Sequence, residues 1–190
     1  MARIAAEIEA EGAVAGIQIG HAGRKASANL PWEGDDHIPA GDPRGWEPIS
    51  PSAIPFGGGL PRVPREMTLA DIERVKADFV AAAKRALAAG FEWLELHFAH
   101  GYLAQSFFSV HANQRTDQYG GDWRDRGRFL LETLAAVRKV WPEHLPLAAR
   151  FGVIEFDGRD DETLAEAIAL AKAFRSNGLD MLNVSIGFST

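Results

Sequence analysis

Hydrophobic and polar residues follow two alternating spacings along the chain. Apolar residues recur every three or four positions in four segments, which predicts helices. These helices span residues 2–11, 68–90, 125–140 and 161–177. Short apolar runs separate them, and such runs between turn residues are typical of buried strands. The predicted strands span residues 14–20, 91–98, 147–151 and 179–186.

The predicted helices have recognisable ends and apolar faces. Thr68 is a suitable N-cap, and Asp71 in the following turn suits the positive end of the helix dipole. Gly90 and Gly178 follow two of the helices as expected C-terminal stops. We expect two buried faces, formed by Ile72, Val75, Phe79 and Ala82 in the second helix and by Leu164, Ile168 and Ala171 in the last.

Strands that alternate with helices predict a parallel sheet, either open and doubly wound or closed as a barrel. Side chains alternate across a strand, and each predicted strand has one apolar face and one small or polar face. A doubly wound sheet requires apolar residues on both faces, whereas a barrel tolerates polar groups inside its mouth. The pattern therefore favours an α/β fold of the (β/α)8 TIM-barrel class, of which this chain carries about four consecutive βα units.

The polar strand faces carry several candidate functional residues. Gln18 lies between Gly16 and Gly20, which leaves room beside an amide that can donate and accept hydrogen bonds. Glu95 and Arg150 lie on adjacent strands, and an alternative is that they form an internal ion pair. Residues 22–65, rich in Pro, Gly and Asp, form an ordered excursion loop in this interpretation.

The composition excludes several classes of protein. The 190 residues are 46% hydrophobic, which is sufficient for one buried core and argues against disorder. The net charge of -6 and the absence of a basic block argue against nucleic-acid binding. No apolar run approaches a membrane span, no signal peptide is evident, and cysteine is absent. We therefore expect a soluble, cytoplasmic protein without disulfides or thiolate chemistry.

The strongest local signal is the sequence HFAHGY, residues 97–102, at the end of the second strand. His97, His100 and Tyr102 place three hydrogen-bond donors at the barrel mouth. A zinc site is one interpretation, but the histidine spacing is not that of helical zinc motifs and a third ligand is not obvious. A structural histidine pair is another. The third is an electrophilic site for a substrate oxygen, with Tyr102 as proton donor.

Other polar residues receive weaker assignments. Arg24 and Lys25 follow the first strand and could meet an anion, although solvated loop charges are the simpler interpretation. Residues 115–121, RTDQYGG, read as an internally bonded turn. His37, His111 and His144 lie in or near loops and receive no role, and we predict no metal site.

Four motifs in order resemble the Old Yellow Enzyme family, the NADH:flavin oxidoreductases, and among them the bacterial xenobiotic reductases most. They are GIQIGHAGRK at residues 16–25, PREM at 64–67, HFAHGY at 97–102 and NQRTDQYGG at 113–121. The resemblance covers essentially the whole chain. It implies FMN as cofactor and NADPH or NADH as reductant.

The resemblance also assigns roles to individual residues. Gln18 matches the glutamine that bonds the pyrimidine edge of FMN. Arg150 matches the arginine beside N1 and O2 of the flavin, where a positive charge favours the reduced form. His97 and His100 match the pair that binds the carbonyl or nitro oxygen of the substrate. Tyr102 matches the tyrosine that protonates it.

The implied reaction transfers hydride from a nicotinamide, through N5 of FMN, to the β-carbon of an activated alkene. Alternatives on the same barrel are a dienoyl-CoA reductase or an amine dehydrogenase relative, and a further alternative is an inactive fragment. We expect the chain to hold the middle strands only, with the N- and C-terminal parts absent, because such barrels need about 250 residues. The full-length protein is expected to be a homo-oligomer.

Overall fold

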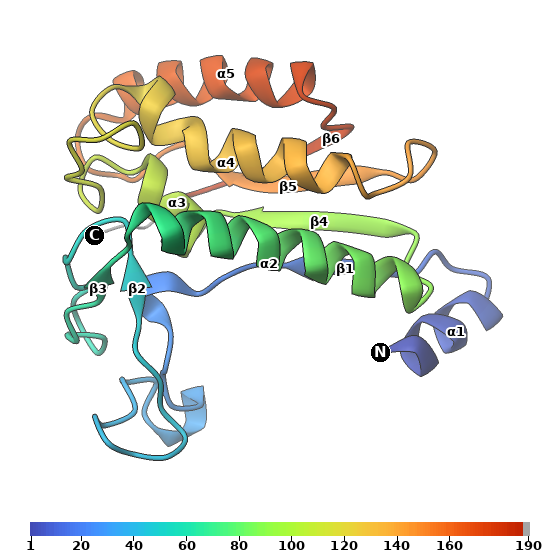
Figure 1. Cartoon of the computed structure of the whole chain (residues 1–190), viewed down its shortest axis with the longest axis horizontal. Helices are drawn as coiled ribbons and strands as arrows, with labels where there is room; N and C mark the ends of the chain where they lie inside the picture. Colours follow the sequence, from blue (N-terminus) through green and yellow to red (C-terminus); the bar gives the residue numbers. More distant parts are fainter. Residues whose placement is uncertain (188–190) are drawn as a thin grey trace.

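The computed structural model describes residues 1–187, which form a four-stranded parallel sheet, a short two-stranded pair and five α-helices (Figure 1). The main strands are β1 (Gly16–Ile19), β4 (Trp93–Phe98), β5 (Leu147–Gly152) and β6 (Met181–Ser185). The helices are α1 (Ala2–Ala10), α2 (Leu69–Ala88), α3 (Leu103–Phe108), α4 (Trp123–Arg138) and α5 (Asp160–Ser176). Every helix and strand expected from the apolar spacing is present, and only the short α3 is an additional helix.

The four strands form one parallel sheet in the order β1-β4-β5-β6, so neighbours in the sequence are neighbours in the sheet. Helices α2, α4 and α5 lie side by side along one face of this sheet (Figure 1). A doubly wound sheet places helices on both faces. The arrangement is that of consecutive βα units of a barrel, as the strand faces predicted.

The hydrophobic core lies between the sheet and these helices. The side chains of the central strands β4 and β5 that face the helices are fully buried, as are their helical partners, whereas Val184 on the edge strand β6 is 62% exposed. The buried side chains include Leu94, Leu96, Phe98, Leu147, Ala149 and Phe151 from the strands and Ile72, Phe129, Leu134, Leu170 and Phe174 from the helices. Apolar burial of this kind supplies the main driving force for folding. The opposite face of the sheet is left to polar side chains.

Helix α2 begins as the sequence predicts. Thr68 accepts a hydrogen bond from the Asp71 backbone N–H at 3.1 Å, and the Asp71 carboxylate accepts one from the Thr68 N–H at 3.0 Å. This reciprocal capping box satisfies two backbone donors that a helix start otherwise leaves unpaired. Ile72, Val75 and Phe79 are buried as expected. The fourth expected position, Ala82, is only half-buried.

The predicted buried face of α5 was wrong. Leu164 and Ile168 are 40% and 49% exposed, whereas Ala167, Leu170 and Phe174 are buried. The helix carries two apolar stripes, and periodicity alone does not show which one meets the sheet. Phe174 fixes the rotation of the helix. The centre of its ring lies 5.3 Å from the centre of the Phe151 ring on β5.

The excursion loop at residues 22–65 is ordered, as expected, and contains more regular structure than its sequence shows. It includes the 3-10 turns η1 (Gly23–Lys25) and η2 (Pro31–Glu33). Its two-residue strand β2 (Ile49–Ser50) pairs with β3 (Arg65–Glu66) in parallel. This pair lies beside the C-terminal ends of the main strands (Figure 1).

In the part of the chain that the structure describes, no helix has both the length and the apolar character to span a bilayer.

Candidate active site

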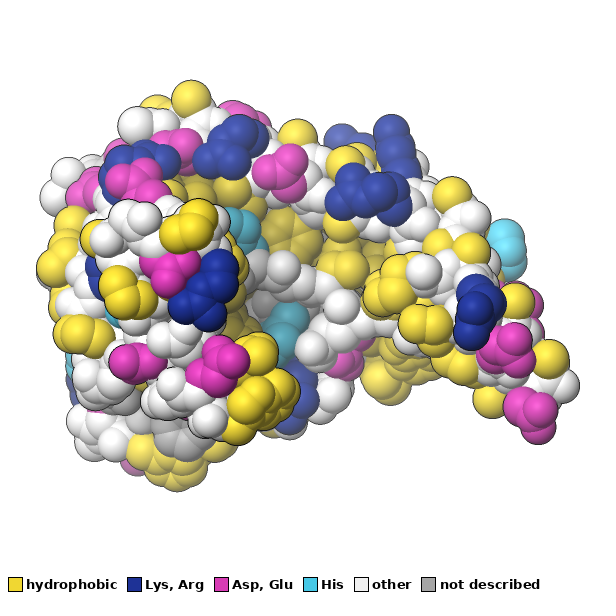
Figure 2. All heavy atoms as spheres, turned by 90° about the horizontal axis from the view of Figure 1, so that it is seen from below, with side chains coloured by type: hydrophobic (Ala, Val, Ile, Leu, Met, Phe, Trp, Pro, Cys, Tyr) yellow, Lys and Arg dark blue, Asp and Glu magenta, His cyan; other side chains and the backbone are white. Residues whose placement is uncertain are grey.

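The polar faces of the four strands meet in register near their C-terminal ends. His97 on β4 is paired with Arg150 on β5, and Arg150 is paired with Asn183 on β6. One layer earlier, Gln18 on β1 is paired with Glu95 on β4. The surface view shows a hollow bordered by histidine, cationic and apolar side chains (Figure 2). Barrel enzymes build their active sites at this end of the strands.

His97 is held as a neutral hydrogen-bond donor. Its side chain lies at the end of β4, and the residue is only 9% exposed. Its Nδ1 accepts the backbone N–H of Ala99 at 3.2 Å, so the proton of the neutral ring lies on Nε2. Burial first, and then the nearby charges of His100 and Arg150, together lower the pKa of His97 to about 4. The Nε2–H therefore remains available to a ligand at neutral pH.

His100 and Tyr102 stand against His97, as the sequence predicted. The centre of the His97 ring lies 5.0 Å from the centre of the His100 ring and 4.9 Å from that of the Tyr102 ring, edge-on in both cases. Nε2 of His100 is 2.7 Å from the Ser185 hydroxyl of β6. Burial lowers the pKa of His100, and Arg150 and Lys25 add to that effect. We call His97, His100 and Tyr102 the donor cluster.

A metal site at the donor cluster lacks ligands. Among residues 1–187, no further His, Cys, Asp or Glu joins His97 and His100 in a group of three possible ligands. The group that does exist in this range is His111, Glu155 and Asp157, away from the donor cluster. Glu155 there accepts hydrogen bonds from Gln105 at 3.2 Å and Ser109 at 2.9 Å.

The alternative Glu95–Arg150 ion pair does not form within the described chain. Instead, Glu95 accepts a hydrogen bond from the Gln18 amide at 2.5 Å and one from Asn183 at 3.2 Å. The register explains this, because Arg150 is paired with His97, two residues beyond Glu95. Since the Gln18 nitrogen is used, its amide oxygen is directed to a ligand or to solvent.

The polar face of the sheet contains a buried donor that has no partner among the described residues. Nε of Arg150 is buried and has no hydrogen-bond partner among the residues that the structure describes. Buried polar atoms are nearly always paired, so this donor is one that a ligand would satisfy. A side chain at position 20 would crowd His97, because a Cβ on Gly20 would lie 3.0 Å from the Cβ of His97. Gln18 and Arg150 thus both lie on the polar face of the sheet, where Arg150 leaves one donor for a ligand.

The assignment of Arg24 and Lys25 to solvated loop charges was wrong. Arg24 is 1% exposed, and its guanidinium donates to the Pro55 carbonyl at 3.0 Å. Lys25 is half-buried, and its ammonium donates to the His100 carbonyl at 3.1 Å. Their position in the sequence could have indicated this burial, since both residues closely follow a strand that ends at the barrel mouth.

The 113–121 loop is internally bonded, as the sequence suggested. The Asn113 amide donates to the carbonyls of Phe107 and Tyr119 at 2.6 and 2.7 Å. Arg115 is paired with Asp117 at 2.5 Å and also donates to the Pro51 and Met67 carbonyls. The loop therefore fixes the connection between α3 and α4 and offers little to a ligand.

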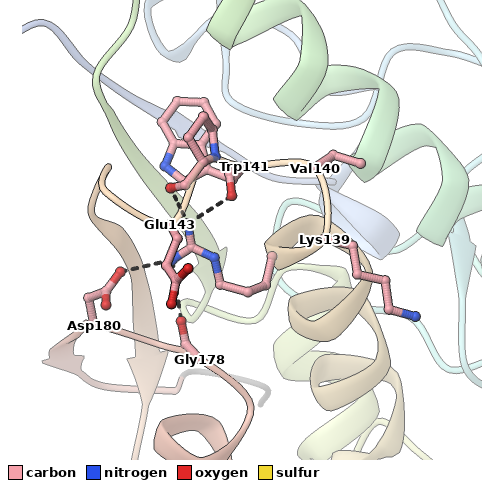
Figure 3. A pocket seen from close by; sticks show the side chains of 8 residues that line it. Lys139, Val140, Trp141, Glu143, Gly178 and Asp180 are labelled. Carbon is pink, nitrogen blue, oxygen red and sulfur yellow. Dashed lines mark hydrogen bonds and ion pairs between the residues drawn. The ribbon is translucent and has the colours of Figure 1, made fainter.

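A separate hollow lies at the opposite end of the strands. Its volume is about 560 Å³, and Trp141, Gly178 and Asp180 are among the residues that line it (Figure 3). Arg138 also lines this hollow. It forms an ion pair with Asp180 at 2.9 Å and donates a hydrogen bond to the Pro142 carbonyl at 2.6 Å. These contacts join the turns before β5 and β6, and this end of a barrel serves stability.

Comparison with known sequences gives a consistent result. The NADH:flavin oxidoreductase / NADH oxidase family matches residues 1–186. An NADH:flavin oxidoreductase of Gibberella zeae is 42% identical over 90% of this chain and 44% of its own length. An NADPH dehydrogenase of Bacillus velezensis is 39% identical over 98% of this chain and 49% of its own length. The chain thus spans about half the length of the curated relatives it matches.

The fold agrees with these sequences. Morphinone reductase in complex with tetrahydroNAD superposes with a TM-score of 0.79 and 30% identity, covering 95% of this chain and 51% of that one. This confirms the barrel class and agrees with the expected cofactors, FMN with a reduced nicotinamide. The xenobiotic reductase branch stays a prediction. The chain belongs to the NADH:flavin oxidoreductase / NADH oxidase family, the family of Old Yellow Enzyme.

Proposed function

We propose that the full-length protein is an FMN-dependent ene-reductase that acts on α,β-unsaturated carbonyl or nitro compounds. The observation that carries this proposal is the donor cluster. Two neutral imidazoles and one phenol converge at the mouth, and the Ala99 N–H fixes the His97 proton on the atom that is free to donate. Donors placed where negative charge develops are a main source of catalysis.

The polar strand faces would hold the cofactor. Gln18 would bond the pyrimidine edge of FMN through its amide, and the Arg150 guanidinium would lie beside the N1 and O2 side. Bound FMN would supply two-electron chemistry, taking hydride from NAD(P)H and returning it to the β-carbon of the alkene. The fixed charge of Arg150 would favour the anionic reduced form.

The donor cluster would act on the substrate itself. Nε2–H of His97 would donate to the carbonyl or nitro oxygen and draw electron density away from the β-carbon. In the tautomer in which the Ser185 hydroxyl donates to Nε2 of His100, the His100 proton lies on Nδ1, which would supply the second hydrogen bond. Tyr102, or water, would then protonate the α-carbon. The Tyr102 hydroxyl makes no hydrogen bond to the described residues, so it is free to do so.

The full-length protein should purify with FMN and reduce 2-cyclohexenone to cyclohexanone with NADPH or NADH. The released cofactor is identified by chromatography, and the product is followed without oxygen so that flavin reoxidation does not compete. Cyclohexanone as substrate is the control, because the donor cluster activates a conjugated alkene and gives no route to a saturated ketone. FAD as the released cofactor, or an unreduced enone, would count against the proposal.

A further inference from the structure

We propose that Lys25 is a positioning residue that holds two members of the donor cluster, His100 and Tyr102, in their working arrangement. The inference rests on the proposed function and extends it to a residue outside the cluster. Lys25 lies in η1, just after β1, and reaches the cluster from the neighbouring strand. Its long side chain thus links the end of β1 to the loop that follows β4.

The Lys25 ammonium makes three contacts at the mouth. Nζ donates to the backbone carbonyl of His100 at 3.1 Å. It also lies 4.9 Å from the centre of the Tyr102 ring and 4.5 Å from that of Phe56. Cations within about 6 Å of an aromatic centroid are attracted to the ring face. The ammonium therefore binds the backbone of one donor residue and the side chain of another.

The loop at His100 needs such support. His100 has a φ of 60°, a left-handed conformation that is uncommon for residues other than glycine, and Gly101 follows with a φ of 69°. The adjacent backbone hydrogen bonds are long, 3.4 Å from the His100 N–H to Ile186 and 3.3 Å from the Tyr102 N–H to Ala99. Strained backbone persists at functional sites only when its surroundings hold it. The Lys25–His100 hydrogen bond supplies part of that constraint.

The charge of Lys25 is sensitive to pH. Burial lowers the pKa of Lys25, Asp35 opposes this shift, and Arg24 adds to it. The other groups that face the ammonium are the rings of His97, His100 and Tyr102. Lys25 therefore loses its charge at a lower pH than a solvated lysine, and the donor cluster loses its support there. An arginine keeps its charge throughout the accessible range.

The Lys25 side chain lies beside a cavity. Lys25, Phe56 and Tyr102 line a cavity of about 590 Å³, so a side chain of similar length has room. Lys25→Met preserves length and removes the charge, whereas Lys25→Arg preserves the charge. Lys172→Met is the matched control, because Lys172 is an exposed residue on α5. All four proteins are compared as the full-length flavoprotein.

We expect Lys25→Met to bind FMN normally and to lose about 10- to 100-fold in kcat for 2-cyclohexenone, the scale of a small misplacement of reacting groups. Lys25→Arg should recover most of this loss. The wild-type kcat should fall at alkaline pH, and in Lys25→Arg that fall should move to higher pH. Crystal structures should show His100 leaving its left-handed conformation in Lys25→Met and keeping it in Lys25→Arg.

The proposal is overturned if Lys25→Met keeps the wild-type kcat, or loses flavin, or retains the His100 conformation. It is also overturned if wild type and Lys25→Arg have the same alkaline limb. A wild-type enzyme that reduces no activated alkene would instead contradict the proposed function. The His100 conformation in the two variant structures would still decide the role of Lys25.

Discussion

The loop that follows β4 and the loop that follows α3 differ in what their polar side chains contact. In the 113–121 loop, Asn113 and Arg115 are buried and bonded to backbone carbonyls and to Asp117. In residues 97–102, the end of β4 and the loop after it, Nε2 of His97 and the Tyr102 hydroxyl make no hydrogen bond within the described chain, and His100 has a left-handed backbone conformation. Both loops match motifs of the same family, yet only one has donors left for a ligand.

This difference separates residues that hold the fold from residues that meet a substrate. A buried polar group whose hydrogen bonds are all made within the protein contributes to stability and costs stability when removed. A donor left without a protein partner at a barrel mouth contributes to ligand binding. Mutations in the two loops should therefore have opposite signatures, with activity lost from one and stability lost from the other.

The largest expected effect is on activity in the 97–102 loop. Replacing both His97 and His100 by Ala removes two hydrogen bonds to the oxygen on which charge develops. We expect a loss of roughly 3–6 kcal/mol of transition-state stabilisation for a cyclic enone, with FMN still bound. Steady-state kinetics and the flavin absorbance measure the two quantities. Normal turnover by the double variant would remove the histidines from the mechanism.

A smaller effect, on stability, is expected in the 113–121 loop. Arg115→Met leaves the Pro51 and Met67 carbonyls without the donor that now satisfies them. We expect about 2–4 kcal/mol of lost stability, since each buried unsatisfied group costs about 1–3 kcal/mol. Thermal unfolding of the full-length protein measures it, while kcat should change little.

The control for Arg115→Met is Arg44→Met. Arg44 also pairs with an aspartate two residues away, Asp42 at 2.9 Å, but its side chain is 60% exposed. Exposed ion pairs contribute little to stability. Equal shifts in the unfolding temperature for the two variants would mean that the carbonyl contacts of Arg115 do not contribute to stability.

Sequence predicted the elements and the donor cluster well, because both depend on local pattern. Helical spacing, the Thr68–Asp71 cap and the position of His97 at a strand end are visible in short segments. The rotation of α5 was not predicted, because two apolar stripes compete and the choice depends on contacts between Phe174 and β5. The burial of Arg24 and Lys25 was missed for a similar reason, since their partners, Pro55 and His100, are distant in sequence.

A third prediction concerns the helix cap beside the Arg115 contact. Thr68 follows Met67, whose carbonyl accepts from Arg115, and caps α2 through its hydroxyl. Thr68→Ala should lower the stability by about 1 kcal/mol, the usual cost of losing a threonine cap. Thr163→Ala in α5 is the control, because no side-chain hydrogen bond of Thr163 is recorded within the described chain. An unchanged unfolding temperature in Thr68→Ala would show that the reciprocal Asp71 bond suffices alone.

The smallest effect at neutral pH is the contribution of His97 protonation to the pH dependence of stability. Its pKa is about 4 in the folded protein, against an ordinary value of 6.5, because burial and then His100 and Arg150 oppose the charged ring. Well above pH 6.5 the His97 ring is neutral in both the folded and the unfolded state, and stability does not depend on its titration. As the pH falls from 6.5 to about 4, the unfolded state binds the proton first, so stability is lost across that window. His97→Gln removes the titrating group. The unfolding temperature of wild type should therefore fall faster than that of His97→Gln between these limits, and parallel curves would contradict the buried, neutral imidazole on which the proposed function depends.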